Sequence, residues 1–177
     1  MTRPADAEFA SVYDDCVWQV YGFFGYRLSS RDDAEDLTQQ TFERALRSWG
    51  RYEPERATRT TWLLAIARNL LIDHYRRRST RREEPATEAL EEIEAEQGSD
   101  PAAAGVSPEL AIALDELTSR QRELIALRYG GGLTGPEIAS LTGLSLANVQ
   151  QILSRSLRQL RGTLTTSSGR PASLRSS

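Results

Sequence analysis

Six arginines lie within residues 68–82, beside a single acidic residue, Asp73. Clustered guanidinium groups neutralise phosphates and gain free energy from counterion release. The neighbouring side chains that could stack on bases or hydrogen-bond to them are Tyr52, Trp62, Asn69, His74 and Tyr75. An ordinary helix end, whose dipole attracts cations, is the alternative, but six arginines exceed what one dipole requires. The segment therefore favours nucleic-acid binding, with Trp62 expected in the core.

A second group of polar side chains recurs at helical spacing in residues 145–161, opposite an apolar stripe. Its members are Asn148, Gln150, Gln151, Ser154, Arg155, Arg158 and Arg161. Amides pair with adenine edges in the major groove, and arginine suits guanine and phosphate. A solvated face in a small helical bundle is the alternative. This face belongs to the second of two helices that are joined by a turn at Gly143. The close succession of helix, turn and helix favours a DNA-binding helix-turn-helix.

The acidic run DDAED, residues 32–36, could hold a metal or an acid–base pair. Acids in a first helical turn more often complement the positive end of the helix dipole, and no matching carboxylate or histidine follows beyond Glu43. A docking face for a basic partner is the better functional interpretation. Cys16 and His74 are the only residues of their types, so we expect no zinc site, no catalytic residue and no cofactor.

Charge is distributed unevenly along the chain. All 22 basic residues are arginine, and the net charge is −3. Residues 83–107 carry eight acidic residues and no basic one, so the flanking parts are both mildly basic. The N-terminus has no signal-peptide pattern, and no apolar run approaches the roughly 18 residues that span a bilayer. We therefore expect no membrane segment and a cytoplasmic location.

Apolar residues recur at three- and four-residue steps, which predicts helices throughout and no strand. The first part should hold helices over about 8–28, 34–49 and from Thr60 onward. In the second part, Ser107 with Pro108, Thr118 with Gln121 and Thr134 with Glu137 have the spacing of helix caps. The fold class is thus all-α, with two small helical domains. Their expected boundaries are 1–82 and 108–164, with a flexible acidic linker at 83–107 and a disordered tail at 165–177.

Two separated segments resemble one family. DAEDLTQQTFERALRSWGRYEPERATRTTWLLAIARNLLIDHYRRR is similar to region two of an extracytoplasmic-function (ECF) sigma factor of the sigma-70 family. LTSRQRELIALRYGGGLTGPEIASLTGLSLANVQQILSRSLRQLR is similar to region four. The resemblance covers about residues 8–162 in family order. It implies a subunit that brings core RNA polymerase to promoters and opens the DNA.

The resemblance also implies roles for residues in the first domain. The D-L-x-Q stretch would dock on the clamp helices of the largest polymerase subunit, through Asp33, Asp36, Gln39, Gln40 and Glu43. The family often has Glu where this chain has Gln40, which should weaken the charge component of docking. The following helix and the loop before it would read the minus-ten element, with Asn69 near a flipped base and with Tyr52, Arg68, Asp73, His74, Arg76 and Arg77 around it.

For the second domain, the resemblance places residues 145–158 in the major groove of the minus-thirty-five element. The side chains expected to contact DNA there are Ser145, Asn148, Gln150, Gln151, Ser154, Arg155 and Arg158. Family members often read G-T-V-K-S-R-L where this chain reads A-N-V-Q-Q-I-L, so Gln150 and Ile152 replace basic residues. The usual phosphate-binding side chains are missing at these two positions. The promoter sequence that relatives prefer therefore cannot be transferred to this chain. The three glycines at 130–132 should let this domain tilt.

Other partners follow from the same resemblance. They are the flap region of core polymerase and an anti-sigma factor that masks both domains. The acidic linker would lie near the RNA exit or template channel, where its charge either mimics nucleic acid or keeps the domains apart. A stand-alone helix-turn-helix regulator, which binds an operator as a dimer without polymerase, and a metal-dependent hydrolase using DDAED are the competing hypotheses.

Overall fold

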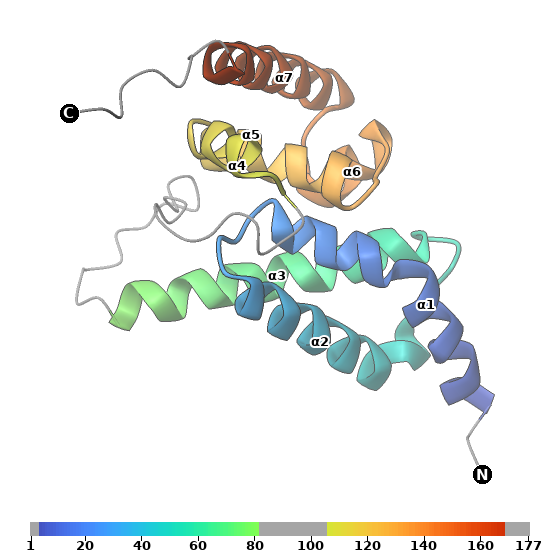
Figure 1. Cartoon of the computed structure of the whole chain (residues 1–177). Helices are drawn as coiled ribbons and strands as arrows, with labels where there is room; N and C mark the ends of the chain where they lie inside the picture. Colours follow the sequence, from blue (N-terminus) through green and yellow to red (C-terminus); the bar gives the residue numbers. More distant parts are fainter. Residues whose placement is uncertain (1–3, 82–105, 169–177) are drawn as a thin grey trace.

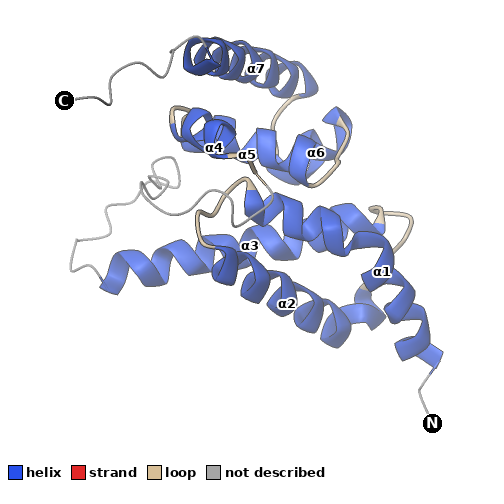
Figure 2. Ribbon diagram, in the orientation of Figure 1, coloured by secondary structure: helices blue, strands red, loops and turns tan. Residues whose placement is uncertain are grey.

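The computed structural model of the chain (Figure 1) describes residues 4–81 and 106–168, and within these ranges it contains helices and no strand (Figure 2). This confirms the all-α prediction. An N-terminal lobe holds α1 (Pro4–Gly25), α2 (Arg31–Ser48), the short helix η1 (Trp49–Arg51) and α3 (Arg59–Arg81). A C-terminal lobe holds α4 (Pro108–Asp115), α5 (Ser119–Ile125), the π-helical turn η3 (Ala126–Gly130), α6 (Gly135–Thr142) and α7 (Leu146–Ser168).

The N-terminal lobe is a bundle in which each of α1, α2 and α3 packs against the other two. Its core is formed by apolar faces with the 3.6-residue period, and Val20, Phe24, Leu63 and Leu70 are at most 1 % exposed. The Ser30 side chain accepts a hydrogen bond from the Asp33 backbone N–H and so begins α2. The bundle fixes which sides of α2 and α3 face solvent.

Each helix of the C-terminal lobe up to α6 begins at a side-chain cap. Ser107 begins α4, and reciprocal capping boxes at Thr118 with Gln121 and at Thr134 with Glu137 begin α5 and α6. These caps confirm the predictions from residue spacing. Between α6 and α7 the backbone turns at Gly143, whose φ of 73° lies in the left-handed region that favours glycine. Helices α6 and α7 thus form the predicted helix-turn-helix.

Arg122 is a buried cation in the C-terminal lobe, with 4 % of its surface exposed. Its Nε and Nη2 both donate to the Leu114 carbonyl, and Nη2 also donates to Asp115 Oδ1 at 2.9 Å. Burial lowers the pKa of Arg122 from its ordinary value, partly offset by the charge of Asp115. These bonds tie α5 to the C-terminal end of α4, because a buried guanidinium requires acceptors.

The two lobes share one continuous hydrophobic core. Leu124, Leu127 and Ile138 of the C-terminal lobe belong to the same buried cluster as the residues of α1 and α3. The backbones of the two lobes approach closely at two glycines, since a Cβ added to Gly22 would lie 2.7 Å from the Gly130 carbonyl oxygen. Gly130 thus packs directly against α1, and the expectation that the three glycines at 130–132 let the second domain tilt stays a prediction. We call this contact zone the seam.

Three segments bear on the predicted boundaries. Val106 is 7 % exposed and packs in the C-terminal lobe, so the last part of the expected linker belongs to that lobe. Helix α7 continues to Ser168, so residues 165–168 are helical, where a disordered tail was expected. The remainder of the acidic linker and of the tail lies outside the described residues.

Candidate nucleic-acid interface and docking face

The outward face of α7 is the most accessible of the predicted DNA-binding surfaces. Val149 and Ser156 are fully buried, so their side of α7 packs against the rest of the C-terminal lobe. The residues predicted to contact the minus-thirty-five element all have exposed side chains, namely Ser145, Asn148, Gln150, Gln151, Ser154, Arg155 and Arg158. Ser145 also accepts a hydrogen bond from the Asn148 backbone N–H and so begins the helix. Amide and guanidinium groups therefore follow one another along a solvent-facing ridge.

The residues predicted to contact the minus-ten element divide between two sides of α3. Arg68 points to the C-terminal lobe, where its Nε lies 2.6 Å from Glu123 Oε1. Asn69, the next residue, is exposed on the side of α2, and Asp73 approaches Arg44 on that side at 3.9 Å. The structure thus separates Arg68 from Asn69, so the two side chains do not form one site.

Glu123 holds two arginines at the seam. Its carboxylate accepts hydrogen bonds from Arg68 Nε and from Arg120 Nη1 at 2.8 Å. Burial raises the pKa of Glu123, but the hydrogen bond and charge of Arg68 and the hydrogen bond from Arg120 outweigh burial and hold the pKa below its ordinary value. Arg68 is consequently engaged within the chain in this arrangement.

A second polar cluster crosses the seam near the start of α3. Glu137 Oε1 accepts hydrogen bonds from Thr58 at 3.1 Å and from Thr61 at 3.0 Å, while Glu137 Oε2 caps α6 through Thr134. Burial raises the pKa of Glu137, and the hydrogen bonds from Thr134, Thr61 and Thr58 together lower it below its ordinary value. The loop before α3, predicted to read DNA, is therefore joined to the helix-turn-helix.

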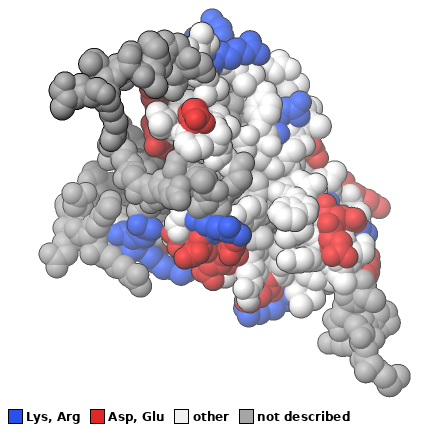
Figure 3. Space-filling model, in the orientation of Figure 1, with Lys and Arg blue, Asp and Glu red and all other residues white. Residues whose placement is uncertain are grey.

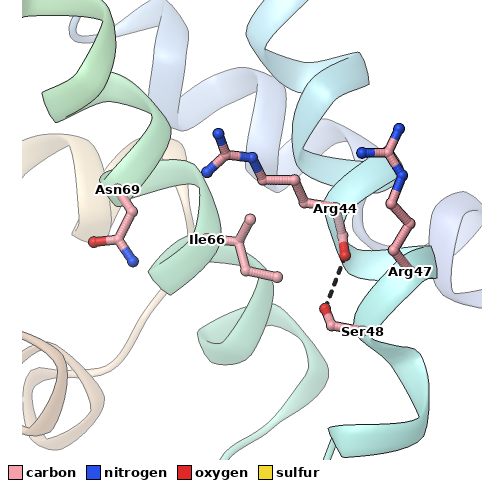
Figure 4. Close-up of a pocket in the computed structure, with 5 residues that line it drawn as sticks. All are labelled: Arg44, Arg47, Ser48, Ile66 and Asn69. Carbon is pink, nitrogen blue, oxygen red and sulfur yellow. Dashed lines mark hydrogen bonds between the residues drawn. The ribbon is translucent and has the colours of Figure 1, made fainter.

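Asn69 lines a cavity of about 310 Å³ between α2 and α3. The other lining residues are Arg44, Arg47, Ser48 and Ile66, and Figure 4 shows Arg44 extending from α2 toward α3 beside Ile66. Neither Arg44 nor Arg47 was predicted from the sequence, because the acidic residues at the start of α2 indicated a docking face for that helix. Their spacing of three residues, which places them on one side of the helix, was the available signal.

Tyr52 lies in a group of aromatic rings at the end of the bundle. Its ring stacks on Trp49 at 5.1 Å and lies 5.2 Å from Trp62, and its hydroxyl donates to the Ala57 carbonyl. Trp62 is half-buried against the core, in line with the expectation that it serves packing. Tyr52 is also half-buried, so part of its ring remains accessible.

The face of α2 predicted to dock on polymerase is polar and solvent-facing. Asp36, Gln39 and Glu43 are exposed and Gln40 is half-buried. Gln40 donates to Asp36 Oδ2 at 2.7 Å, and Gln39 donates to Glu43 Oε1 at 3.1 Å. Each amide thus orients an acid one turn away, which leaves carboxylate oxygens directed at solvent.

Asp33 stands apart from that group because the end of α3 covers it. Its Oδ2 lies 3.3 Å from Arg78 Nη1 and 3.9 Å from His74 Nε2. His74 is consequently placed beside the start of α2, away from Asn69. Arg76 and Arg77 are exposed at this end of α3. Figure 3 shows basic groups gathered here and along α7, at separate ends of the visible face.

No helix in residues 4–81 or 106–168 combines the length and the apolar character needed to cross a membrane. The same described residues contain no group of three or more His, Cys, Asp or Glu side chains placed to hold a metal ion. The DDAED run therefore presents no assembled metal site among them.

Comparison with protein families identifies two matches along the chain. Residues 12–81 match Sigma-70 region 2, and residues 113–162 match Sigma-70, region 4. The two segments singled out from the sequence both lie within these matches, in the same order.

Three curated proteins similar to the chain are ECF RNA polymerase sigma factors. BldN of Streptomyces coelicolor is 33% identical over 158 residues, covering 88% of this chain and 60% of BldN. SigE of Mycolicibacterium smegmatis is 36% identical over 173 residues, covering 96% and 65%. SigX of Bacillus subtilis is 30% identical over 159 residues, covering 86% and 81%. The chain thus spans less than two thirds of the length of BldN and of SigE.

Two solved structures have a similar fold. The sigma factor RpoE from Bartonella quintana, in complex with the anti-sigma factor NepR, matches with a TM-score of 0.69 at 24% identity, covering 89% of this chain and 97% of that chain. CnrH in complex with the cytosolic domain of CnrY matches with a TM-score of 0.59 at 26% identity, covering 90% and 87%. The RpoE match supports the fold alone.

Proposed function

This chain belongs to the ECF RNA polymerase sigma factors of the sigma-70 family, and we propose that it directs promoter-specific transcription initiation. It binds core RNA polymerase, recognises minus-thirty-five and minus-ten elements, and opens the DNA. The observation that carries this proposal is the presence of both sigma regions, in family order, on one all-helical chain.

The two DNA contacts have different chemistry in this proposal. The exposed face of α7, from Ser145 to Arg158, reads base edges in the major groove of the minus-thirty-five element. On α3, Asn69 reads a base of the minus-ten element, and Arg76 and Arg77 neutralise phosphates. Base contacts select the promoter, whereas phosphate contacts set the overall affinity and its dependence on salt.

Core polymerase is the proposed macromolecular partner. The clamp helices of its largest subunit bind the α2 face formed by Asp36, Gln39, Gln40 and Glu43, and its flap region binds the second domain. Charge complementarity supports docking of the acidic face on a basic surface. An anti-sigma factor is a further proposed partner, as the ECF sigma factor family implies; CnrH, a similar structure, was likewise solved with a protein partner, the cytosolic domain of CnrY. The chain's own side chains carry out no covalent chemistry, and no cofactor is required.

Run-off transcription with purified core polymerase tests the proposal. We expect discrete transcripts only when the chain and the core enzyme are both present, and weak binding of promoter DNA by the chain alone. A stand-alone regulator would instead bind an operator tightly without polymerase, usually as a dimer. Absence of new start sites with the core enzyme would overturn the proposal.

A further inference from the structure

Two glutamates of the C-terminal lobe engage the part of the N-terminal lobe that is predicted to contact the minus-ten element. Glu123 Oε1 lies 2.6 Å from Arg68 Nε, and Glu137 Oε1 accepts hydrogen bonds from Thr58 and Thr61. Arg68 belongs to the predicted minus-ten group, and Thr58 is the last residue of the loop before α3. Both features are therefore occupied within the chain while the seam is closed.

The contact between Glu123 and Arg68 differs from an ordinary surface ion pair. The side chains of Arg68 and Glu123 are only 27% and 15% exposed, so water screens their attraction less than it does at the surface. The Glu123 carboxylate also accepts a hydrogen bond from Arg120 Nη1 at 2.8 Å. Guanidinium groups bind carboxylates and phosphates with the same donor geometry. Glu123 thus takes the place at Arg68 that a phosphate of the promoter would otherwise take.

Further contacts favour closure of the seam. Arg27 Nη1, just after α1, donates a hydrogen bond to the Ser119 carbonyl of α5 at 2.9 Å. Leu124 and Leu127 of the C-terminal lobe are fully buried in the core that they share with α1 and α3. Separation of the lobes exposes part of this apolar surface to water, which is unfavourable. Polar and apolar contacts thus act together to hold the free chain closed.

We propose that the seam is an autoinhibitory contact, in which Glu123 and Glu137 withhold Arg68 and the loop before α3 from promoter DNA until core polymerase binds the separated lobes. Core polymerase drives the opening because it binds the open arrangement better than the closed one. The apparent affinity of the chain for core polymerase is consequently reduced by the fraction of chains that are closed. The inference rests on the proposed sigma function and adds a regulatory role for two glutamates outside the DNA-contacting set.

The test uses the full chain with core polymerase at a promoter identified by start-site mapping. Glu123→Gln removes the charge that holds Arg68, and Thr61→Val removes a hydrogen-bond donor to Glu137 from the opposite lobe. Both variants weaken closure, so a larger fraction of free chains is open. The chain concentration that gives half-maximal run-off transcription should fall about tenfold for Glu123→Gln and about fivefold for Thr61→Val. The transcript yield at saturating chain concentration should equal that of wild type.

Small-angle X-ray scattering of the free chain measures opening without polymerase. The radius of gyration should be larger in both variants than in wild type, because the separated lobes are less compact. Glu109→Gln is the matched control, since it removes the same charge from an exposed position on α4 of the C-terminal lobe. This control should change neither the half-maximal concentration nor the radius of gyration.

Two results would overturn the inference. One is a half-maximal concentration in both variants that equals or exceeds the wild-type value, and the other is a radius of gyration that neither variant changes. Thr61→Val preserves the shape of the side chain and lies in the other lobe, so it decides the question if Glu123→Gln unfolds. If the wild-type chain gives no initiation, the proposed function fails. If wild type initiates and neither variant acts at a lower concentration, the autoinhibitory role alone fails.

Discussion

Asn69 and Arg77 lie on the same helix, about 12 Å apart along its axis, and both are exposed. An amide recognises base edges, whereas an exposed arginine in a cluster at a helix end offers mainly charge to phosphates. The two residues should therefore affect transcription in different ways, and that difference can be measured promoter by promoter.

Asn69→Ala should change which promoters are used, by about tenfold at promoters that depend on the recognised base. Arg77→Gln should weaken all promoters similarly and reduce the magnitude of the salt slope by about 1. Both effects can be measured by run-off transcription across a panel of promoters at several salt concentrations. If the two variants change every promoter alike, the division between base reading and phosphate binding is wrong.

Glu123 is the residue whose protonation should matter for stability. Its pKa lies below the ordinary value of 4.5 in the folded chain, because the contacts with Arg68 and Arg120 outweigh the effect of burial. The carboxylate thus contributes stability above about pH 4.5, and this contribution is lost as the pH falls through the lowered pKa.

Glu123→Gln should therefore lower the free energy of unfolding by about 2 kcal/mol at pH 7. The difference from wild type should shrink below about pH 4.5, as the wild-type carboxylate becomes protonated. Urea unfolding at a series of pH values measures both effects. Glu53→Gln, at an exposed ion pair with Arg56, is the control and should leave stability nearly unchanged. A pH-independent difference for Glu123→Gln would contradict the ion-pair account.

At the scale of elements, the helix-turn-helix depends on where glycine is required. Gly143 has a φ of 73° between α6 and α7, where an L side chain is strained. Gly162 lies inside α7, and a Cβ there would meet no atom within 4 Å. The same substitution should therefore have opposite effects at the two positions.

Gly143→Ala should destabilise the chain by about 1 kcal/mol, because it forces alanine into the left-handed region. Gly162→Ala should stabilise it by about 0.5–1 kcal/mol, because alanine is the better helix former. Denaturant unfolding of both variants checks the signs. If both substitutions changed the free energy of unfolding in the same direction, the turn at Gly143 would not have the left-handed backbone conformation.

Local spacing predicted the elements well for a physical reason. A helix cap such as Thr118 with Gln121 requires only residues three positions apart, so the sequence reveals it directly. Arg122 and the seam could not be predicted in this way. Acceptors for a buried guanidinium, and the approach of Gly22 to Gly130, depend on segments brought together only by the complete fold. The same limit hid the cavity between α2 and α3, whose sides come from two helices.

At the scale of the whole molecule, the lobes pack too closely for simultaneous contact with both promoter elements. The minus-thirty-five and minus-ten positions are roughly 85 Å apart on straight duplex at 3.4 Å per base pair. A compact chain of this length has a radius of gyration of about 16 Å. We therefore expect the lobes to separate at the seam when the chain acts, as proposed, at a promoter with both elements.

Joining the lobes across the seam should block transcription reversibly. Thr58→Cys with Glu137→Cys places two thiols where the wild-type side chains hydrogen-bond, while Cys16 is buried and protected. A short cleavable bis-maleimide should abolish run-off transcripts, and cleavage of the linker should restore them. Because Glu137→Cys also removes the side-chain cap of α6, the double variant after cleavage of the linker serves as the control for that loss. Full activity of the linked form would mean that the seam does not need to open.

The most direct test of the central claim maps transcript 5′ ends from genomic DNA transcribed by core polymerase, with and without the chain. The account predicts a set of discrete 5′ ends that appears only when both are present, preceded by two shared sequence elements at constant spacing. It also predicts that Asn69→Ala changes membership of that set. Identical 5′ ends with and without the chain would contradict the assignment as a sigma factor.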